Sequence, residues 1–91
     1  MGFEWDEAKR LANLGKHGID FVDAIAVFEG DTVTVEDDRY SYGEQRFVSF
    51  GLLQGQVVAV VHTERDDRIH IISAKKATQS EQRTYFAQLS D

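Results

Sequence analysis

Residues 57–78 read V-V-A-V-V-H-T-E-R-D-D-R-I-H-I-I-S-A-K-K-A-T and place two apolar, β-branched runs around a polar turn at 64–68. Such a pattern predicts two antiparallel strands joined as a hairpin. Charged side chains near the ends of buried strands are held in fixed positions, which suits an active site, although solvated turn charges give the same pattern. The candidates on this hairpin are His62, Glu64, Arg65, Arg68, His70, Lys75 and Lys76.

The sequence before the hairpin predicts helices first and strands afterwards. Asp6 and Asp20 are suited to cap helices over residues 7–16 and 21–30, and both segments carry an apolar stripe. After Asp31 the apolar period changes to two, which is typical of strands. The other expected elements are strands at 32–35, 46–53, 57–63 and 68–74, a polar loop at 36–43, and a last helix from the capping box of Thr78 and Glu81 to Leu89.

This order of elements predicts an α+β fold with a mainly antiparallel four-stranded sheet, two N-terminal helices and one C-terminal helix. A meander is the economical topology because the strands follow one another in the chain. The segment around Phe3 and Trp5 is interpreted as a short strand or an arm. We expect the helices mainly on one face of the sheet, and one domain over residues 1–91, because a chain of this length builds one modest core.

The composition narrows the classes of function. A formal net charge of −6 argues against a general affinity for nucleic acid, and the charge is uneven, with −7 in residues 1–45 and +1 in residues 46–91. The acidic half could face a basic partner and the other half an anion, or the split could reflect solubility alone. The absence of cysteine excludes disulfides and cysteine zinc sites. Since neither an apolar leader nor a membrane-length run is visible, we expect a cytoplasmic protein with no membrane association.

Several short blocks, spread over almost the whole chain, carry a family resemblance. They are F-E-W-D-E-A-K at 3–9, N-L-G-K-H-G-I at 13–19, V-F-E-G at 27–30, G-E-Q-R-F at 43–47, V-V-H-T-E-R at 60–65 and R-I-H-I-I-S-A-K-K-A-T at 68–78. Together, and in this order, these blocks resemble the BrnT family. The resemblance implies a RelE-like fold and a ribonuclease toxin of a type II toxin–antitoxin module that inhibits translation and growth.

The resemblance also implies partners. A BrnA-like antitoxin, a ribbon-helix-helix protein, would neutralise the toxin, and operator DNA would be bound only through that antitoxin. Because a dimeric antitoxin favours two toxin copies by symmetry, we expect a heterotetramer of two toxin and two antitoxin chains.

RNA cleavage without a metal needs a base for the 2′-hydroxyl proton, an acid for the leaving 5′ oxygen, and cations near phosphorus. Arg65 suits the last task, because a guanidinium binds phosphate oxygens bidentately. Glu64 or His62 would act as base or orient it, and Lys16 or His17 would serve the leaving group. For each residue a structural role competes: a turn ion pair, a hydrogen-bonded core histidine or a charge that stabilises a helix end.

We expect RNA to be bound by Arg68, His70, Lys75, Lys76 and Arg46, in a groove between the end of the first helix and the hairpin. Lys75 and Lys76 stand on opposite faces of an extended strand, so at most one should reach that groove. No cofactor or metal is expected, because the spacing of His62, His70 and Glu64 matches no established zinc signature.

The chain departs from the family pattern in being strongly acidic and in carrying Lys-Lys before Ala77, where the family tends to show arginine. Lysine keeps the charge but lacks the bidentate geometry. The alternative function is therefore a catalytically weak or inactive antitoxin-binding protein that acts in operon autoregulation.

Overall fold

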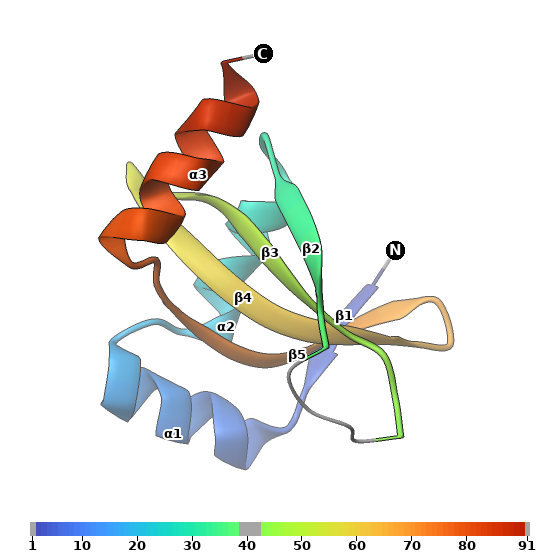
Figure 1. Cartoon of the computed structure of the whole chain (residues 1–91). Coiled ribbons are helices and arrows are strands. Elements are labelled where there is room, and N and C mark those ends of the chain that lie inside the picture. Colours follow the sequence, from blue (N-terminus) through green and yellow to red (C-terminus); the bar gives the residue numbers. More distant parts are fainter. Residues whose placement is uncertain (1, 39–42, 91) are drawn as a thin grey trace.

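The computed structural model describes residues 2–38 and 43–90, and Figure 1 shows their arrangement. The predicted polar loop at 36–43 lies partly outside the described residues. The helices and strands are β1 (Gly2–Trp5), α1 (Glu7–His17), α2 (Phe21–Ala24), a 3-10 helix η1 (Ile25–Phe28), β2 (Val33–Asp37), β3 (Arg46–Leu53), β4 (Gln56–Arg65), β5 (Arg68–Lys76) and α3 (Gln79–Leu89).

Within the described residues the strands form one five-stranded sheet in the order β1-β5-β4-β3-β2. β2 to β5 are consecutive antiparallel neighbours, whereas β1 pairs in parallel with β5. The prediction of a mainly antiparallel four-stranded sheet is therefore wrong, because the N-terminal segment is a fifth strand. Its four residues are too few for a clear period, but Phe3 and Trp5 point toward the core and the backbone between them covers an edge of β5.

The second N-terminal helix also differs from its prediction. Residues Phe21–Ala24 form a single α-helical turn, and the chain then tightens into η1. A Cβ atom placed on Gly51 of β3 would lie 2.7 Å from the carbonyl oxygen of Val27, so η1 approaches the sheet more closely than a side chain at position 51 would allow. The sequence predicted a regular α-helix as far as Gly30. In the structure the segment that lies close to β3 is the tighter 3-10 helix η1.

The helices occupy both faces of the sheet, whereas we expected them mainly on one. We call the face under α1, α2 and η1 the inner face; its core includes Phe21, Val58 and Val60. We call the opposite face the outer face. There α3 packs Tyr85 against Val57, and the Tyr85 hydroxyl donates a hydrogen bond to the carbonyl oxygen of Asp31 at 2.7 Å. Figure 1 shows α3 and α2 on opposite sides of the sheet.

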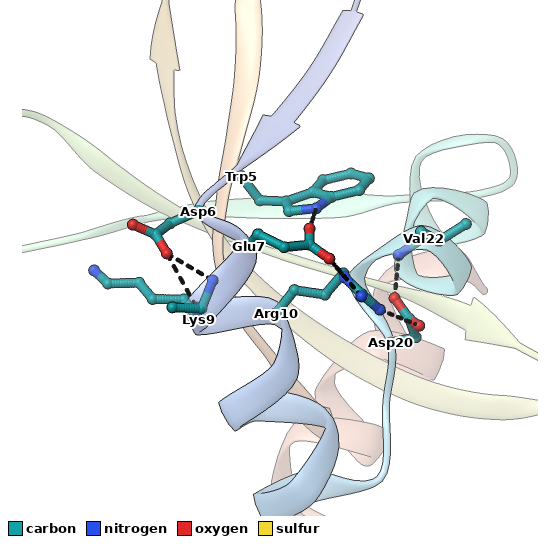
Figure 2. A network of polar contacts seen from close by, with 8 residues as sticks. Trp5, Asp6, Glu7, Lys9, Arg10, Asp20 and Val22 are labelled. Atoms are coloured by element: carbon teal, nitrogen blue, oxygen red, sulfur yellow. Dashed lines mark hydrogen bonds and ion pairs between the residues drawn. The ribbon is translucent and has the colours of Figure 1, made fainter.

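The predicted helix caps are present. Asp6 accepts hydrogen bonds from the backbone at the start of α1, Asp20 does so for α2, and Thr78 and Glu81 form the capping box of α3. A polar network joins the first two helices, as Figure 2 shows. Arg10 pairs with Glu7 and with Asp20, whose Oδ2 lies 2.8 Å from the guanidinium. The hydrogen bond from Arg10 to Glu7 holds the pKa of the Glu7 carboxyl below its usual range.

Asn13 fixes α1 to the sheet. β1 pairs with residues 68–71 of β5, so the backbone of Ala74 lies beyond the register covered by that strand. There the buried Asn13 amide donates to the carbonyl oxygen of Ala74 at 2.9 Å and accepts from its N–H at 3.1 Å. Its nitrogen also donates to the Ile19 carbonyl oxygen at 2.9 Å. One side chain thus satisfies buried backbone groups that would otherwise lack partners.

No helix of the described residues is both long and apolar enough to cross a membrane.

Candidate functional site

Most of the cations predicted to bind RNA lie on the outer face. Side chains alternate along a strand, and residues paired across strands share a face. Arg65 lies eight positions after Val57, which packs under α3, so both point to the outer face. Arg68 is paired with Arg65, and His70 with the next outward residue, Thr63. Arg46 lies four positions before Phe50, which also packs under α3.

The two lysines at the end of β5 separate as predicted. Lys75 is paired with Ala59 and lines an outer-face hollow together with Val61. Lys76 instead lines a hollow with Gly18 and Ile19, on the side of the helices that cover the inner face. Lys75 therefore shares a face with the arginines of the hairpin, and Lys76 does not.

Arg65 stands at the exposed end of the hairpin with a carboxylate as its partner. Its Nη2 donates to Oε1 of Glu44 at 3.2 Å, and the side chain is 48% exposed. The same Glu44 oxygen lies 4.0 Å from Nη2 of Arg46. Exposed ion pairs contribute little to stability, so Glu44 can give way to another anion at small cost. The geometry therefore provides two guanidinium groups around one carboxylate, at a position where a phosphate could replace it.

His70 has a carboxylate partner that the sequence interpretation missed. The parallel pairing of β1 with β5 places Glu4 opposite His70, and Oε2 of Glu4 lies 2.9 Å from Nδ1 of His70. The ring is mostly buried and Glu4 about a third exposed. A carboxylate on Nδ1 fixes the ring orientation and leaves Nε2 as the nitrogen for proton exchange. The alternation in Phe3-Glu4-Trp5 could have indicated that Glu4 points away from the core. The sequence could not show that Glu4 lies opposite His70, 66 positions later.

His62 has a different environment. It lies on the inner face, 5% exposed, between the rings of Phe28 and Phe47, and its Nε2 is 2.7 Å from the Ser49 hydroxyl. Ser49 in turn is 2.8 Å from the hydroxyl of Thr34. Burial lowers the pKa of His62 to about 4, so its ring is neutral at pH 7. The environment of His62 matches the structural role considered from the sequence, a hydrogen-bonded core histidine, more closely than the role of a base.

Of the remaining predicted residues, Glu64 directly precedes Arg65 in β4, whereas Lys16 and His17 lie far from it. Glu64 is exposed and lines a shallow hollow with Asp67 and Arg68 at the turn of the hairpin. Lys16 and His17 are the last residues of α1 and lie near Ala74, toward the C-terminal end of β5. The hairpin turn lies at the opposite end of β5, before Arg68. The nine residues of β5 separate these two ends by about 26 Å. Figure 1 shows the last turn of α1 and the hairpin turn at opposite ends of the sheet.

The histidines do not converge with acids into a metal site. His62 and His70 point to opposite faces of the sheet, so the combination with Glu64 considered from the sequence is not assembled. Across residues 2–38 and 43–90, no group of three or more His, Cys, Asp or Glu side chains is arranged to hold a metal ion.

Comparison with known families gives this arrangement a class. Residues 5–81 match the family model described as "Ribonuclease toxin, BrnT, of type II toxin-antitoxin system". This match covers most of the chain and defines a toxin of the type II class, and that class implies an antitoxin partner. The chain belongs to the BrnT family of ribonuclease toxins. The comparison with curated proteins gave no match.

Proposed function

We propose that this toxin cleaves RNA without a metal, at the hairpin end of the outer face, by attack of a ribose 2′-hydroxyl on the adjacent phosphorus. The observation that carries the proposal is the grouping of Arg46, Arg65, Arg68 and His70 on one face of a chain that belongs to a ribonuclease toxin family. The outer face is open beyond α3, whereas the inner face is filled by side chains.

The arginines would bind the scissile phosphate. Arg65 is the residue we assign to the charge that develops on phosphorus, because its guanidinium is half exposed and is paired with an exchangeable carboxylate, that of Glu44. Arg68, its register partner on β5, would hold an adjacent phosphate, and Arg46 would add a third cation.

His70 is the group that the geometry favours for proton transfer. With Nδ1 donating to Glu4, a neutral ring presents Nε2 as an acceptor. The 2′ oxygen would bond to phosphorus as its proton passes to Nε2, and the bond from phosphorus to the 5′ oxygen would break. The 5′ oxygen would leave with a proton from a general acid. The products are a 2′,3′-cyclic phosphate and a 5′-hydroxyl end.

The other predicted roles stay predictions. His62 or Glu64 as base would need access to the outer face, and His62 lies buried on the inner one. Lys16 or His17 could serve the leaving group only if RNA passed along the length of β5. Lys75 shares the outer face and is the better placed of the two lysines to extend RNA binding, while Lys76 would contact RNA only around the sheet edge.

We further propose a BrnA-like ribbon-helix-helix antitoxin as the partner, in a complex of two toxin and two antitoxin chains that reaches operator DNA through the antitoxin alone. The cellular site would be the cytoplasm, where RNA is translated. Support comes from the family, whose type II class requires a protein antitoxin.

The decisive experiment is RNA cleavage by antitoxin-free protein in EDTA, with Arg65→Ala compared at equal folded concentration. Arg83→Ala is the matched control, because Arg83 is an exposed arginine on α3. We expect cleavage in EDTA by the wild type and the control, cyclic phosphate ends, and a loss of about 100-fold or more in Arg65→Ala. Ribosomes are added in a parallel reaction.

Each result of this experiment has a definite meaning. Cleavage that requires added magnesium would overturn metal independence, and equal activity of Arg65→Ala and wild type would remove the hairpin from the site. An absence of cleavage with and without ribosomes would favour the alternative, a toxin relative that binds its antitoxin and acts in operon autoregulation without catalysis.

A further inference from the structure

The outer face is covered over one half and open over the other. α3 buries Val57 through Tyr85, but Val35 on β2, farther across the same face, is 45% exposed. By contrast, Val58 and Val60 on the inner face are almost fully buried. A single exposed apolar residue is ordinary on a protein surface, so the surroundings of Val35 decide whether this part of the face is suited to bind another molecule.

Two hollows join to form a single groove beside α3. One, of about 200 Å³, lies between α3 and β2, and the other, of about 230 Å³, continues over β3 and β4. They share Val35, Phe50 and Glu81. We call this surface the α3 groove; its floor consists of Val33, Val35, Val48, Phe50, Ala59 and Val61.

The rim of the α3 groove is acidic. Asp37 and Asp38 line it from the end of β2, and Glu81 lines it from the first turn of α3, against one described cation, Lys75. Acidic groups around an apolar floor repel phosphates and attract lysine and arginine side chains. The rim belongs mainly to the half of the chain that carries the net charge of −7. Its chemistry therefore selects a basic protein segment rather than RNA.

We propose that the α3 groove binds an amphipathic helix of the antitoxin, with the apolar side of that helix on the groove floor and its lysine and arginine side chains beside the rim. Membership in the type II class supplies a protein partner, and the charge of the rim supplies its chemistry. A helix is the expected form because sheet faces are completed by helices, and α3 already covers the neighbouring half.

This binding mode accounts for neutralisation if the proposed ribonuclease site is correct. Lys75 lines the groove, and it shares the outer face with His70 and Arg65. A helix seated in the groove would cover part of the same face and exclude the RNA backbone from it. The binding proposal itself rests on the groove and on the family, and not on catalysis, so it can hold even where catalysis fails.

The first test measures the dissociation constant of the purified antitoxin encoded beside the toxin gene, by calorimetry, for Val35→Lys. The matched control is Val22→Lys, which changes a valine that is 54% exposed on α2, over the inner face. Because a lysine on the groove floor removes an apolar contact and opposes a basic partner, we expect binding about tenfold weaker for Val35→Lys. The control should bind within about twofold of the wild type.

The second test concerns the rim. Asp38→Lys reverses a charge beside the groove, and Asp23→Lys reverses one on α2, where Asp23 is also exposed. We expect Asp38→Lys to weaken antitoxin binding about threefold at low salt, with a smaller difference at high salt, because surface charges are screened. Asp23→Lys should have a smaller effect.

Melting curves establish folding, and Val35→Thr, which keeps the size and the β-branching of valine, repeats the test if Val35→Lys unfolds. Equal dissociation constants for groove variants and controls would overturn the proposal. Two other results would also overturn it. The groove variants could lose RNA cleavage while antitoxin binding stays intact, or they could dissociate a dimer formed by the toxin alone. Failure of cleavage in the wild type leaves these binding measurements unaffected, so the two proposals fail separately.

Discussion

His62 and His70 lie on neighbouring strands of one hairpin, and the structure gives them opposite environments. His62 points to the inner face, where it stacks on Phe47 and meets Phe28 edge-on, and it has a lowered pKa because it is buried. His70 points to the outer face and has the Glu4 carboxylate on its Nδ1. The same residue type thus supports packing on one face and suits proton transfer on the other. The direction of the side chain, more than its identity, separates the two roles.

The contrast extends to the two faces as wholes. The inner face is closed by α1, α2 and η1 and carries most of the core, while the outer face carries the basic hairpin end and the α3 groove. Substitutions on the inner face should therefore change stability and leave the chemistry of folded molecules unchanged. Substitutions of the exposed side chains of the outer face should change the chemistry and leave stability almost unchanged.

The largest expected effect separates the two histidines. His70→Gln should lower RNA cleavage about 1,000-fold, because a positioned acid–base group is lost. His62→Gln, compared at equal folded concentration, should stay within about tenfold, since His62 lies behind the sheet. Single-turnover cleavage rates of the antitoxin-free proteins test this. The reverse order of the two rates would move the base to the inner face and overturn the distinction.

Asn13→Ala should have a large effect on stability and little on cleavage. It removes the partner of the Ala74 N–H and carbonyl groups, which are buried. We expect the free energy of unfolding to fall by about 3 kcal/mol, measured by urea denaturation. Gly15→Ala, with nothing near its Cβ position, is the control on the same helix and should raise stability by about 1 kcal/mol. A loss of cleavage in folded Asn13→Ala would contradict the assignment of catalysis to the outer face.

Local signals made much of the fold predictable. The caps at Asp6 and Asp20, the capping box of Thr78 and the hairpin at residues 57–78 depend on neighbours in the sequence, and all were found. Two features depend instead on contacts between distant segments: the parallel pairing of β1 with β5, and the placement of helices on both faces of the sheet. A four-residue strand has too few positions to reveal its period, so the sheet was predicted one strand short.

The candidate site was predictable as a set of residues more than as an arrangement. Alternation along β5 correctly separated Lys75 from Lys76. The partners of the cations were not readable, because Glu4 lies opposite His70 only through the parallel pairing, and Glu44 reaches Arg65 from the start of β3. The single-residue pattern also could not show whether His62 faced the core or the solvent.

A pH titration tests the inner face directly. Since the pKa of His62 falls to about 4 in the folded protein from 6.5 unfolded, the unfolded chain binds the proton first as the pH falls. The stability that this group contributes is complete above about pH 6.5 and decreases toward pH 4. Between pH 7.5 and 5 we expect a loss of about 2 kcal/mol.

The control for this titration is His62→Gln, whose stability should change less over the same pH range. Urea unfolding at both pH values gives the comparison, and pH 5 lies above the range where most exposed carboxyl groups titrate. Equal pH dependence of wild type and variant would show that His62 is solvated in the folded protein.

The smallest expected effect is on the outer face. Glu44→Gln removes the carboxylate that accepts from Arg65 at 3.2 Å and lies 4.0 Å from the Arg46 guanidinium. Because that carboxylate competes with a phosphate for the same donors, we expect RNA to bind about two- to threefold more tightly at low salt. Glu29→Gln, at an exposed position beside η1, serves as the control for the loss of one charge. Weaker RNA binding by Glu44→Gln would mean that Glu44 orients Arg65 for the phosphate instead of competing with it.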